Sequence, residues 1–479
     1  MRRQKSRQVW CRLGDRNTRF FHLVANFRRA KNHILKVVHN GYVVEGLPVI
    51  KDAAVSFFFN LFRSPDRFRI GLGPVGFKTL SASSSASLER DITLEELKQS
   101  VWDCDGSKSP GPDGFNFKFY RLAWNFIADD LLDLANNFFK TGRLPKEVNH
   151  AYVHLIPKTA SPAGFKDFRP ISLIHDIYKI MDKVLSSRLK AVMHDLISEN
   201  QTAFLTGRQI IDGFLVANEA VHSLKRYRVP SLIFKVDFHK AFDSVQWDYL
   251  EQVMRHMGFG EKWINWINTC ISIAKLSVLI NGSPSKEFLT GRGIRQGDPL
   301  SPFLFLIAVE RLSVLFQKAA SNDLFKGIPF GDFCLSHLQY ADDTLIFMPA
   351  NLHMVKTIKR ILLWFAICSG LHMNFHKSSL IGINVGEDTC ASMAYSVFCR
   401  FDSLPCSYLG MPLGSNPKRL STWKPIIENF RRKLSMWRCR MLSMAGRICL
   451  IKSVLSSLPV YYMSSFLMPK GVCNILTSI

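Results

Sequence analysis

Three absences in the 479-residue sequence narrow the classes of protein that it can encode. The longest unbroken apolar runs, such as residues 303–309, are far shorter than the roughly 20 residues of a membrane-spanning helix. No apolar stretch follows the basic start Met1-Arg-Arg-Gln-Lys5, so this start does not resemble a secretory signal. None of the eleven cysteines forms a Cys-x-x-Cys pair, which argues against a disulfide framework and a zinc knuckle. We therefore predict a soluble intracellular protein of the nucleus or cytoplasm, without a membrane partner.

Acidic residues are also scarce. There are 38 Asp and Glu against 62 Lys and Arg, which gives a formal net charge of +24. Such an excess indicates a polyanionic partner, either nucleic acid or an anionic membrane surface. Because 47% of the residues are hydrophobic, the chain can build a packed core, and wholesale disorder is excluded. The length suggests about three domains or lobes.

The positive charge is concentrated near the two ends of the chain. Residues 1–36 contain eleven Lys and Arg and one acidic residue, with Trp10, Phe20 and Phe21 among them. This mixture suits phosphate contacts and base stacking, and a solvated helix face is the alternative. Residues 424–452 carry eight basic residues and one Glu. Trp423 and Trp437 in this region either pack in a core or lie along nucleic acid.

Three further patterns divide the chain. The serine-rich residues 81–87 indicate a low-complexity linker at the main domain boundary. Thr93-Leu-Glu-Glu96 is a capping-box pattern that predicts a helix through about residue 103. Apolar residues at helical spacing predict a longer helix over residues 176–198.

Two groups of carboxylates lie at a predicted strand end and at a predicted hairpin tip, where they could bind a ligand. The apolar run 232–236 predicts a strand that ends at Asp237 and turns into a helix. In residues 338–347, two strand-like arms flank Asp342 and Asp343, which predicts a hairpin with adjacent carboxylates at its tip. Neighbouring carboxylates repel each other unless a cation compensates them, and Mg²⁺ binds through carboxylates together with substrate phosphates. Two such ions would activate a hydroxyl group and stabilise departing pyrophosphate, with Asp237 and Asp342 bridging them and Asp343 in support.

The order of several motifs resembles the reverse transcriptases of LINE-type, non-LTR retrotransposons, especially those of plants. Three blocks resemble successive polymerase motifs, and six others agree in order along essentially the whole chain. The three are Phe234-Lys-Val-Asp-Phe-His-Lys-Ala-Phe-Asp243, Gly293-Ile-Arg-Gln-Gly-Asp-Pro-Leu-Ser-Pro302 and Tyr340-Ala-Asp-Asp343. The others are Lys108–Gly114, Leu155–Lys158, Phe168–Leu173, Gln201–Arg208, Asn374–Lys377 and Tyr408–Gly414.

The resemblance implies an α+β, right-hand polymerase with fingers, an antiparallel palm sheet and a thumb, preceded by a basic helical extension. It implies that Asp237, Asp342 and Asp343 are catalytic metal ligands for two Mg²⁺ ions, with Mn²⁺ as a substitute. The remaining assignments that it implies are listed by role. They are Lys158 and Arg169 for the incoming triphosphate, Phe242 for exclusion of the 2′-hydroxyl, Gln296 and Gly297 for the templating pair and sugar, Lys377 for protonation of pyrophosphate, and Tyr408–Gly414 as a primer grip. The Gly297 backbone would approach the nucleotide, and a helix capped by Ser301 would follow.

The same resemblance implies a division of the chain into four parts. They are a basic extension and linker (1–90), a segment before the fingers (91–138), fingers and palm (139–414) and a basic, thumb-like region (415–479). Relative to the family pattern we expect a truncated element, without endonuclease, RNase H or zinc-knuckle regions.

We therefore expect an RNA-directed DNA polymerase that acts on an RNA template, a DNA primer or nicked target DNA, and dNTPs. The alternative is a catalytically inactive remnant that binds nucleic acid through its basic ends. A group II intron maturase shares the palm motifs, but the LINE-like sequences around Asp237 and Tyr408 disfavour this alternative.

Overall fold

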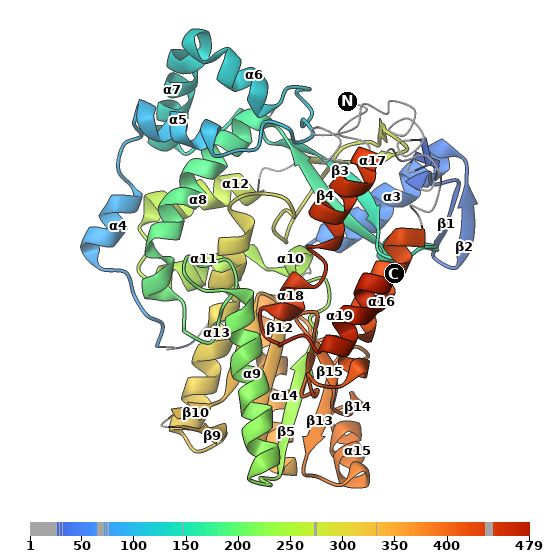
Figure 1. The fold of residues 1–479 in the computed structure, drawn as a ribbon. Helices are drawn as coiled ribbons and strands as arrows, with labels where there is room; N and C mark the ends of the chain where they lie inside the picture. The colour runs from blue at the N-terminus through green and yellow to red at the C-terminus, as the bar shows by residue number, and fades with distance from the viewer. Residues whose placement is uncertain are drawn as a thin grey trace.

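The computed structural model describes residues 26–479 except 28, 31, 65–70, 72, 74–75, 146, 273–274, 332 and 436–443. Helices and strands are mixed along the chain and form two hydrophobic cores (Figure 1). The predicted α+β class is confirmed. Among the described helices, none is both long enough and apolar enough to cross a membrane.

A five-stranded sheet carries the predicted carboxylate motifs. Its order is β11 (His337–Tyr340), β12 (Asp343–Pro349), β5 (Ser231–Val236), β13 (Ser379–Ile383) and β14 (Arg400–Asp402). All neighbours are antiparallel except β13 and β14, which are parallel, so the expectation of an antiparallel sheet is wrong at that edge. Strand β5 lies in the middle, and five of its six residues are buried, as its mostly apolar sequence predicts.

A second sheet lies beside the first. It consists of β3 (His150–Pro157), β4 (Phe168–Ile174), β6 (Lys275–Ile280), β7 (Ser283–Pro284) and β8 (Phe288–Leu289). Strands β3 and β4 pair antiparallel, with Ile156 opposite Arg169. This pairing fixes Arg169 near the loop of residues 158–167 that closes the β3–β4 hairpin, close to Lys158.

Long helices pack around the sheets and bury most of the first core. They are α8 (Asp176–Leu196), α11 (Trp247–His256), α12 (Glu261–Ser272), α13 (Ser301–Ser321) and α14 (Leu352–Ser369). The long helix predicted over residues 176–198 is thus confirmed as α8. Helix α13 differs from the prediction by one residue. Leu300 occupies the cap position and Ser301 is already helical, because the Leu300 N–H donates to Asp182 instead of the cap being closed by Ser301.

The part of the chain before β3 contains a β-hairpin and several helices. These are β1 (Lys36–His39), β2 (Tyr42–Glu45), α3 (Leu47–Phe62), α4 (Ala82–Leu88), α5 (Leu94–Trp102), α6 (Phe117–Leu122) and α7 (Trp124–Thr141). The prediction of a serine-rich linker is wrong, since residues 82–88 form α4. The Ser81 hydroxyl accepts the Ser84 N–H at the start of α4, and Leu88 is buried at its end. Helix α5 is confirmed, and the Thr93 side chain accepts the Glu96 N–H.

The second core joins one side of the five-stranded sheet to the C-terminal helices. Helix α9 (Ile210–Arg226) contributes to it, as do β9 (Ile328–Phe330) and β10 (Phe333–Leu335), which form a small hairpin. The short helix α10 (Ala241–Ser244) belongs to the first core. The remaining elements are α15 (Glu387–Ser396), β15 (Cys406–Tyr408), β16 (Met411–Leu413), α16 (Leu420–Ser435), α17 (Met444–Leu450), α18 (Val460–Met463) and α19 (Lys470–Ser478).

Two sequence predictions on the basic ends have different outcomes. Trp423 is fully buried on α16 and its Nε1 donates to the Pro417 carbonyl at 2.9 Å, so it packs in a core. Trp437 and residues 1–25, which include most of the expected basic helical extension, lie outside the described residues.

Candidate active site

Asp237 stands at the end of the central strand β5, as the sequence predicts. Its backbone is held on both sides, because its N–H donates to Ser378 Oγ at 3.1 Å and its carbonyl accepts the Asn374 N–H at 2.7 Å. Strand β5 is buried between β12 and β13. The carboxylate therefore rests on a rigid part of the molecule.

The predicted hairpin with a carboxylate tip is also present. Tyr340 on β11 pairs with Asp343 on β12, which leaves Ala341 and Asp342 as the turn. Since Thr344 pairs with Val236, the next position of the same register places Asp343 opposite Asp237. The hairpin thus brings its two carboxylates to the end of β5.

The negative charges of these side chains act on one another. Burial, and then the charges of Asp343 and Asp237, raise the pKa of the Asp342 carboxyl. Burial also raises the pKa of Asp343, although nearby Lys235 opposes this effect. Neighbouring carboxylates with raised pKa values lack sufficient positive compensation and favour binding of a cation.

A cleft of about 1200 Å³ opens in front of this edge of the sheet. Eight of the nine sequence-predicted site residues line it, together with Lys108 of the upstream motif. The eight are Lys158, Arg169, Asp237, Phe242, Gln296, Gly297, Asp342 and Lys377. Asp343 does not line the cleft. It lies toward β15, where its charge adds to the effect of burial in raising the pKa of Tyr408.

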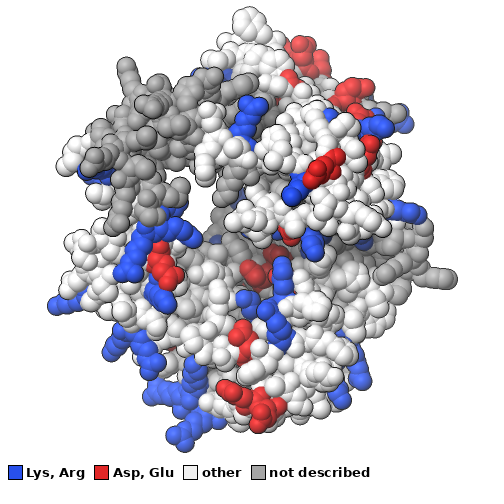
Figure 2. All heavy atoms as spheres, turned by 90° about the vertical axis from the view of Figure 1, so that its right-hand side faces the viewer, with Lys and Arg blue, Asp and Glu red and all other residues white. Residues whose placement is uncertain are grey.

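The cleft contains cations from both sheets. Lys158 Nζ donates to the Lys166 carbonyl at 3.0 Å, and its pKa is lowered, mainly by burial and then by the charge of Lys377. Lys377 Nζ lies 3.9 Å from Asp237 Oδ2, and its side chain is 69% exposed. These positive groups are suited to a substrate that carries phosphates. Figure 2 shows Lys and Arg side chains also spread over one outer face, mostly below its central hollow.

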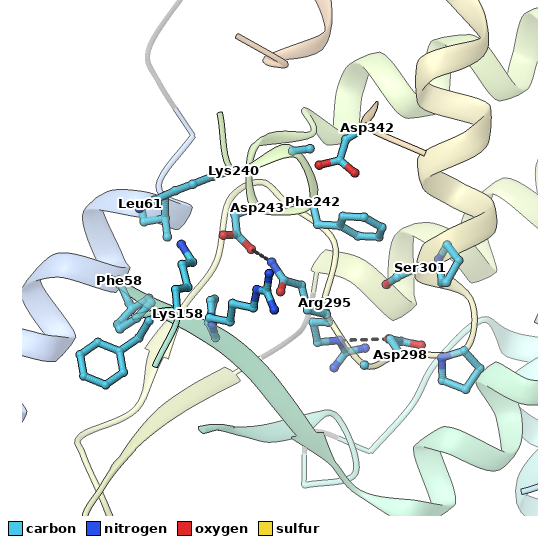
Figure 3. A pocket seen from close by; sticks show the side chains of 18 of the residues that line it. Phe58, Leu61, Lys158, Lys240, Phe242, Asp243, Arg295, Asp298, Ser301 and Asp342 are labelled. Atoms are coloured by element: carbon cyan, nitrogen blue, oxygen red, sulfur yellow. Dashed lines mark hydrogen bonds and ion pairs between the residues drawn. The ribbon is translucent and has the colours of Figure 1, made fainter. Parts of the chain in front are cut away.

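Phe242 forms part of the floor of the cleft. Its ring stacks on Phe305 of α13, with centroids 4.6 Å apart and an angle of 13° between the planes. Its backbone carbonyl accepts the Ile294 N–H at 2.8 Å. Figure 3 shows the ring between Asp342 and the loop that contains Arg295.

Gln296 and Gly297 attach the loop before α13 to strand β4 and, through Gln296, to helix α10. The Gln296 carbonyl accepts the Ser172 N–H of β4 at 2.9 Å, and its Nε2 donates to Asp243 at 3.0 Å. Gly297 has φ 105°, and a Cβ there would approach the Ser172 carbonyl to 3.2 Å. The glycine therefore permits both the positive φ and close contact with the backbone of β4.

Sequence reasoning assigned no role to Asp243 and Lys240, which also line the cleft. Asp243 is buried, and burial raises its pKa to about 6, against the lowering effect of Lys240. Lys240 has φ 50°, and its Nζ lies 4.6 Å from the centre of the Phe57 ring. Both residues lie inside the quoted block 234–243, and only three-dimensional contacts distinguish them from ordinary turn residues.

A buried cluster supports the Gln296 loop from below. Arg295 makes an ion pair with Asp298 at 3.3 Å (Figure 3). The Arg295 guanidinium also lies 4.2 Å from the centre of the Tyr178 ring. Arg295 Nη1 also donates to Asn149 Oδ1 at 2.8 Å. Asp182 accepts the Leu300 N–H at 2.8 Å and completes the attachment of the loop to α8.

A divalent metal fits the donor set that faces the cleft. Asp237 and Asp342 offer carboxylate oxygens, the ligand type of Mg²⁺. The charges of Asp343 and Asp237 act on Asp342 more strongly than the compensating charge of Arg169. Within the described part of the chain, no group of three or more His, Cys, Asp or Glu is arranged to hold a metal ion by itself. The arrangement is therefore suited to an ion that is held by two carboxylates together with a phosphate-bearing substrate.

The sequence is similar to those of two proteins from transposable elements. The chain is 29% identical over 460 residues to the transposon TX1 uncharacterized 149 kDa protein of Xenopus laevis. The aligned region covers 94% of this chain and 34% of that protein. It is 26% identical over 359 residues to the Pol polyprotein of the retrotransposable element R2DM of Drosophila melanogaster, covering 73% and 32% respectively. The chain thus spans about a third of the length of these two relatives.

One solved structure and one family model complete the comparison. Telomerase of Candida tropicalis, in complex with a fragment of telomeric RNA, aligns with a TM-score of 0.40 and 14% identity over 67% of this chain and 53% of that one. Residues 156–413 match the model of the reverse transcriptase (RNA-dependent DNA polymerase) family. This match spans more than half of the chain. It includes the carboxylates, the Gln296 loop and the cleft cations Lys158, Arg169 and Lys377. The chain belongs to the reverse transcriptase family.

Proposed function

We propose that this chain is an RNA-directed DNA polymerase of a non-LTR retrotransposon. It extends the 3′-hydroxyl of a DNA primer, or of nicked target DNA, on an RNA template. The observation that carries the proposal is the meeting of Asp237 and Asp342 in one cleft with Lys158 and Arg169. Carboxylates for a metal and cations for a triphosphate are what nucleotidyl transfer requires.

In the proposed reaction, the primer 3′-hydroxyl loses its proton to water, and its oxygen forms a bond with the α-phosphorus of a dNTP. The bond from that phosphorus to the bridging oxygen breaks, and pyrophosphate leaves with the electron pair. Asp237 and Asp342 would hold Mg²⁺, or Mn²⁺ in its place, with Asp343 in support, and two bound ions would supply activation of the hydroxyl and stabilisation of the leaving group. Side chains of this chain would bind the triphosphate, contact the sugar, position the templating pair and donate a proton.

Lys158 and Arg169 would bind the triphosphate from the β3–β4 hairpin. Phe242 would lie under the sugar, and Gln296 with Gly297 would position the templating pair. Lys377 would donate a proton to pyrophosphate, and its 3.9 Å approach to Asp237 supports a place beside the reacting phosphates. Residues 139–414 would form the fingers and palm, residues 91–138 the preceding segment and residues 415–479 a thumb, with the basic residues 1–90 as an additional nucleic-acid contact.

The test is extension of a DNA primer on an RNA template by the purified chain, with Mg²⁺ or Mn²⁺ and with Asp237→Asn as the control. We expect extension by the wild-type chain and loss of at least about 10³-fold in the variant, because the variant lacks a metal ligand. A folded wild-type chain that retards RNA in a gel but extends no primer with either metal would overturn the proposal. That result would favour the nucleic-acid-binding remnant.

A further inference from the structure

The motif at residues 201–208 has no role in the proposed function, yet it lies against the catalytic hairpin. Residues 198–208, which we call the edge segment, connect α8 to α9 and run along the free edge of β11. The Gln339 N–H donates to the Asn200 carbonyl at 2.8 Å, and the Thr202 N–H donates to the Gln339 carbonyl at 2.9 Å. The edge segment thus covers the outer strand of the five-stranded sheet.

The side chain of Gln201 reaches from this segment to the turn of the hairpin. Gln201 is fully buried, and its Oε1 accepts the N–H of Ala341 at 3.0 Å and the N–H of Ala203 at 3.0 Å. Both partners are backbone donors, so the atom that faces them must be the amide oxygen. Gln201 therefore joins the edge segment to the residue immediately before Asp342.

The turn that Gln201 contacts has a conformation that its sequence disfavours. Ala341 has φ 54°, the left-handed region, at the first of the two residues between β11 and β12. Glycine is the preferred residue for a positive φ at this position of a hairpin, and an alanine there is destabilising. A hydrogen bond to the Ala341 N–H offsets such a cost.

We propose that Gln201 is a positioning residue that holds the Ala341–Asp342 turn in the conformation in which Asp342 faces the cleft. The inference rests on the proposed function, since it assigns to Gln201 the placement of a metal-binding carboxylate. Gln201 acts through the turn and does not itself line the cleft.

Two observations support this role. The edge segment is a firm support, because Arg208 Nη1 donates to the carbonyls of Ser198 and Gln201, each at 2.6 Å, and the Ser198 N–H donates to Glu310 at 3.1 Å. In addition, Gln201 Nε2 is buried without a hydrogen-bond partner among the described residues. An unsatisfied buried donor is destabilising, so Gln201 is a poor choice for stability alone.

The experiment compares three variants of the full chain. Gln201→Leu removes the acceptor at nearly constant size, whereas Gln201→Glu keeps an oxygen acceptor for both N–H groups. Thr202→Val is the matched control, because it is buried in the same segment and loses only its 3.2 Å hydroxyl bond to the Gln339 carbonyl. The readouts are kcat, KM for dNTP and the hydrogen-exchange rate of the Ala341 amide.

We expect Gln201→Leu to lower kcat by roughly 100-fold, the effect of a displacement of about 1 Å at a reacting group, with KM for dNTP within about twofold. The Ala341 amide should exchange at least about tenfold faster. Gln201→Glu should recover most of both values, and Thr202→Val should leave both near the wild type.

Equal losses in Gln201→Leu and Thr202→Val would overturn the proposal, because they would indicate general packing. Unchanged kcat and Ala341 exchange in Gln201→Leu would overturn it directly. If the wild-type chain extends no primer, the proposed function fails, while the exchange rate of Ala341 still decides whether Gln201 holds the turn.

Discussion

The side-chain amide of Gln296 donates to the buried carboxylate of Asp243 over 3.0 Å. The carbonyl of the same Gln296 accepts the Ser172 N–H of β4 at 2.9 Å. One residue thus ties the loop before α13 both to the strand that carries Arg169 and to the turn that carries Phe242. In the proposed reaction this bond sets the spacing between the triphosphate contacts and the sugar contact.

Asp243 predicts a dependence of stability on pH. Its pKa is raised from 3.8 to about 6 by burial, so the folded chain binds this proton more tightly than the unfolded chain. The stabilisation is complete below about pH 4 and is lost as the pH rises through about 6. Asp243→Asn keeps an acceptor for Gln296 without the buried charge.

We therefore expect Asp243→Asn to raise the melting temperature more at neutral pH than at about pH 5. Thermal unfolding at the two pH values measures this difference. Asp129→Asn, at an exposed position of α7, serves as the control. An equal change of melting temperature at both pH values would contradict the assignment.

Phe242→Ala should admit ribonucleotides. Removal of the ring opens the space under the sugar, so we expect discrimination between dNTP and rNTP to fall by about tenfold or more, equivalent to at least about 1.4 kcal/mol. Single-nucleotide incorporation of each substrate measures it. Phe305→Leu is the control, because it removes the 4.6 Å stack and leaves Phe242 in place. Unchanged discrimination in Phe242→Ala would remove this residue from sugar selection.

Two variants of Lys377 distinguish the effect of its positive charge from its ability to donate a proton. Lys377→Arg keeps the positive charge beside Asp237, but a guanidinium does not give up its proton near neutral pH. If Lys377 is a proton donor, both Lys377→Arg and Lys377→Ala should lower kcat by about 10²-fold, with little change in KM for dNTP. Steady-state extension measures both constants. Full activity of the Arg variant would assign Lys377 an electrostatic role only.

Trp423 should contribute to stability and not to nucleic-acid binding. It is fully buried and packs near Tyr462, with ring centroids 5.8 Å apart. Trp423→Ala should lower the free energy of unfolding by about 3–5 kcal/mol. Below its melting temperature, the salt dependence of RNA binding should be unchanged, because the residue makes no phosphate contact. A reduced salt slope at constant fold would contradict a purely structural role.

The elements that hold the site were predictable because their signals are local. The apolar run before Asp237 and the two arms around Asp342 and Asp343 have the apolar, β-type composition and the length of strands, and both form as predicted. Residues 81–87 were mispredicted, since serine repeats indicate a linker although Ser81 can cap a helix and Leu88 can anchor it.

The remaining features depend on contacts between distant residues, which one sequence does not reveal. The parallel pairing of β13 with β14 is set by the chain path through α15. Gln201 accepts the Ala341 N–H although 140 positions separate the two residues in the sequence. Asp343 stands next to Asp342 in sequence but lies outside the cleft, because side chains beyond the turn follow the alternation of β12.

The central claim is that Asp342, together with Asp237, serves metal-dependent nucleotidyl transfer. The most direct test is extension of oligo(dT) on poly(rA) with Mg²⁺, comparing the wild-type chain with Asp342→Asn at equal RNA binding. We predict extension by the wild-type chain and its loss in the variant. Extension that persists in Asp342→Asn, or that is missing from a folded, RNA-binding wild-type chain, would contradict the account.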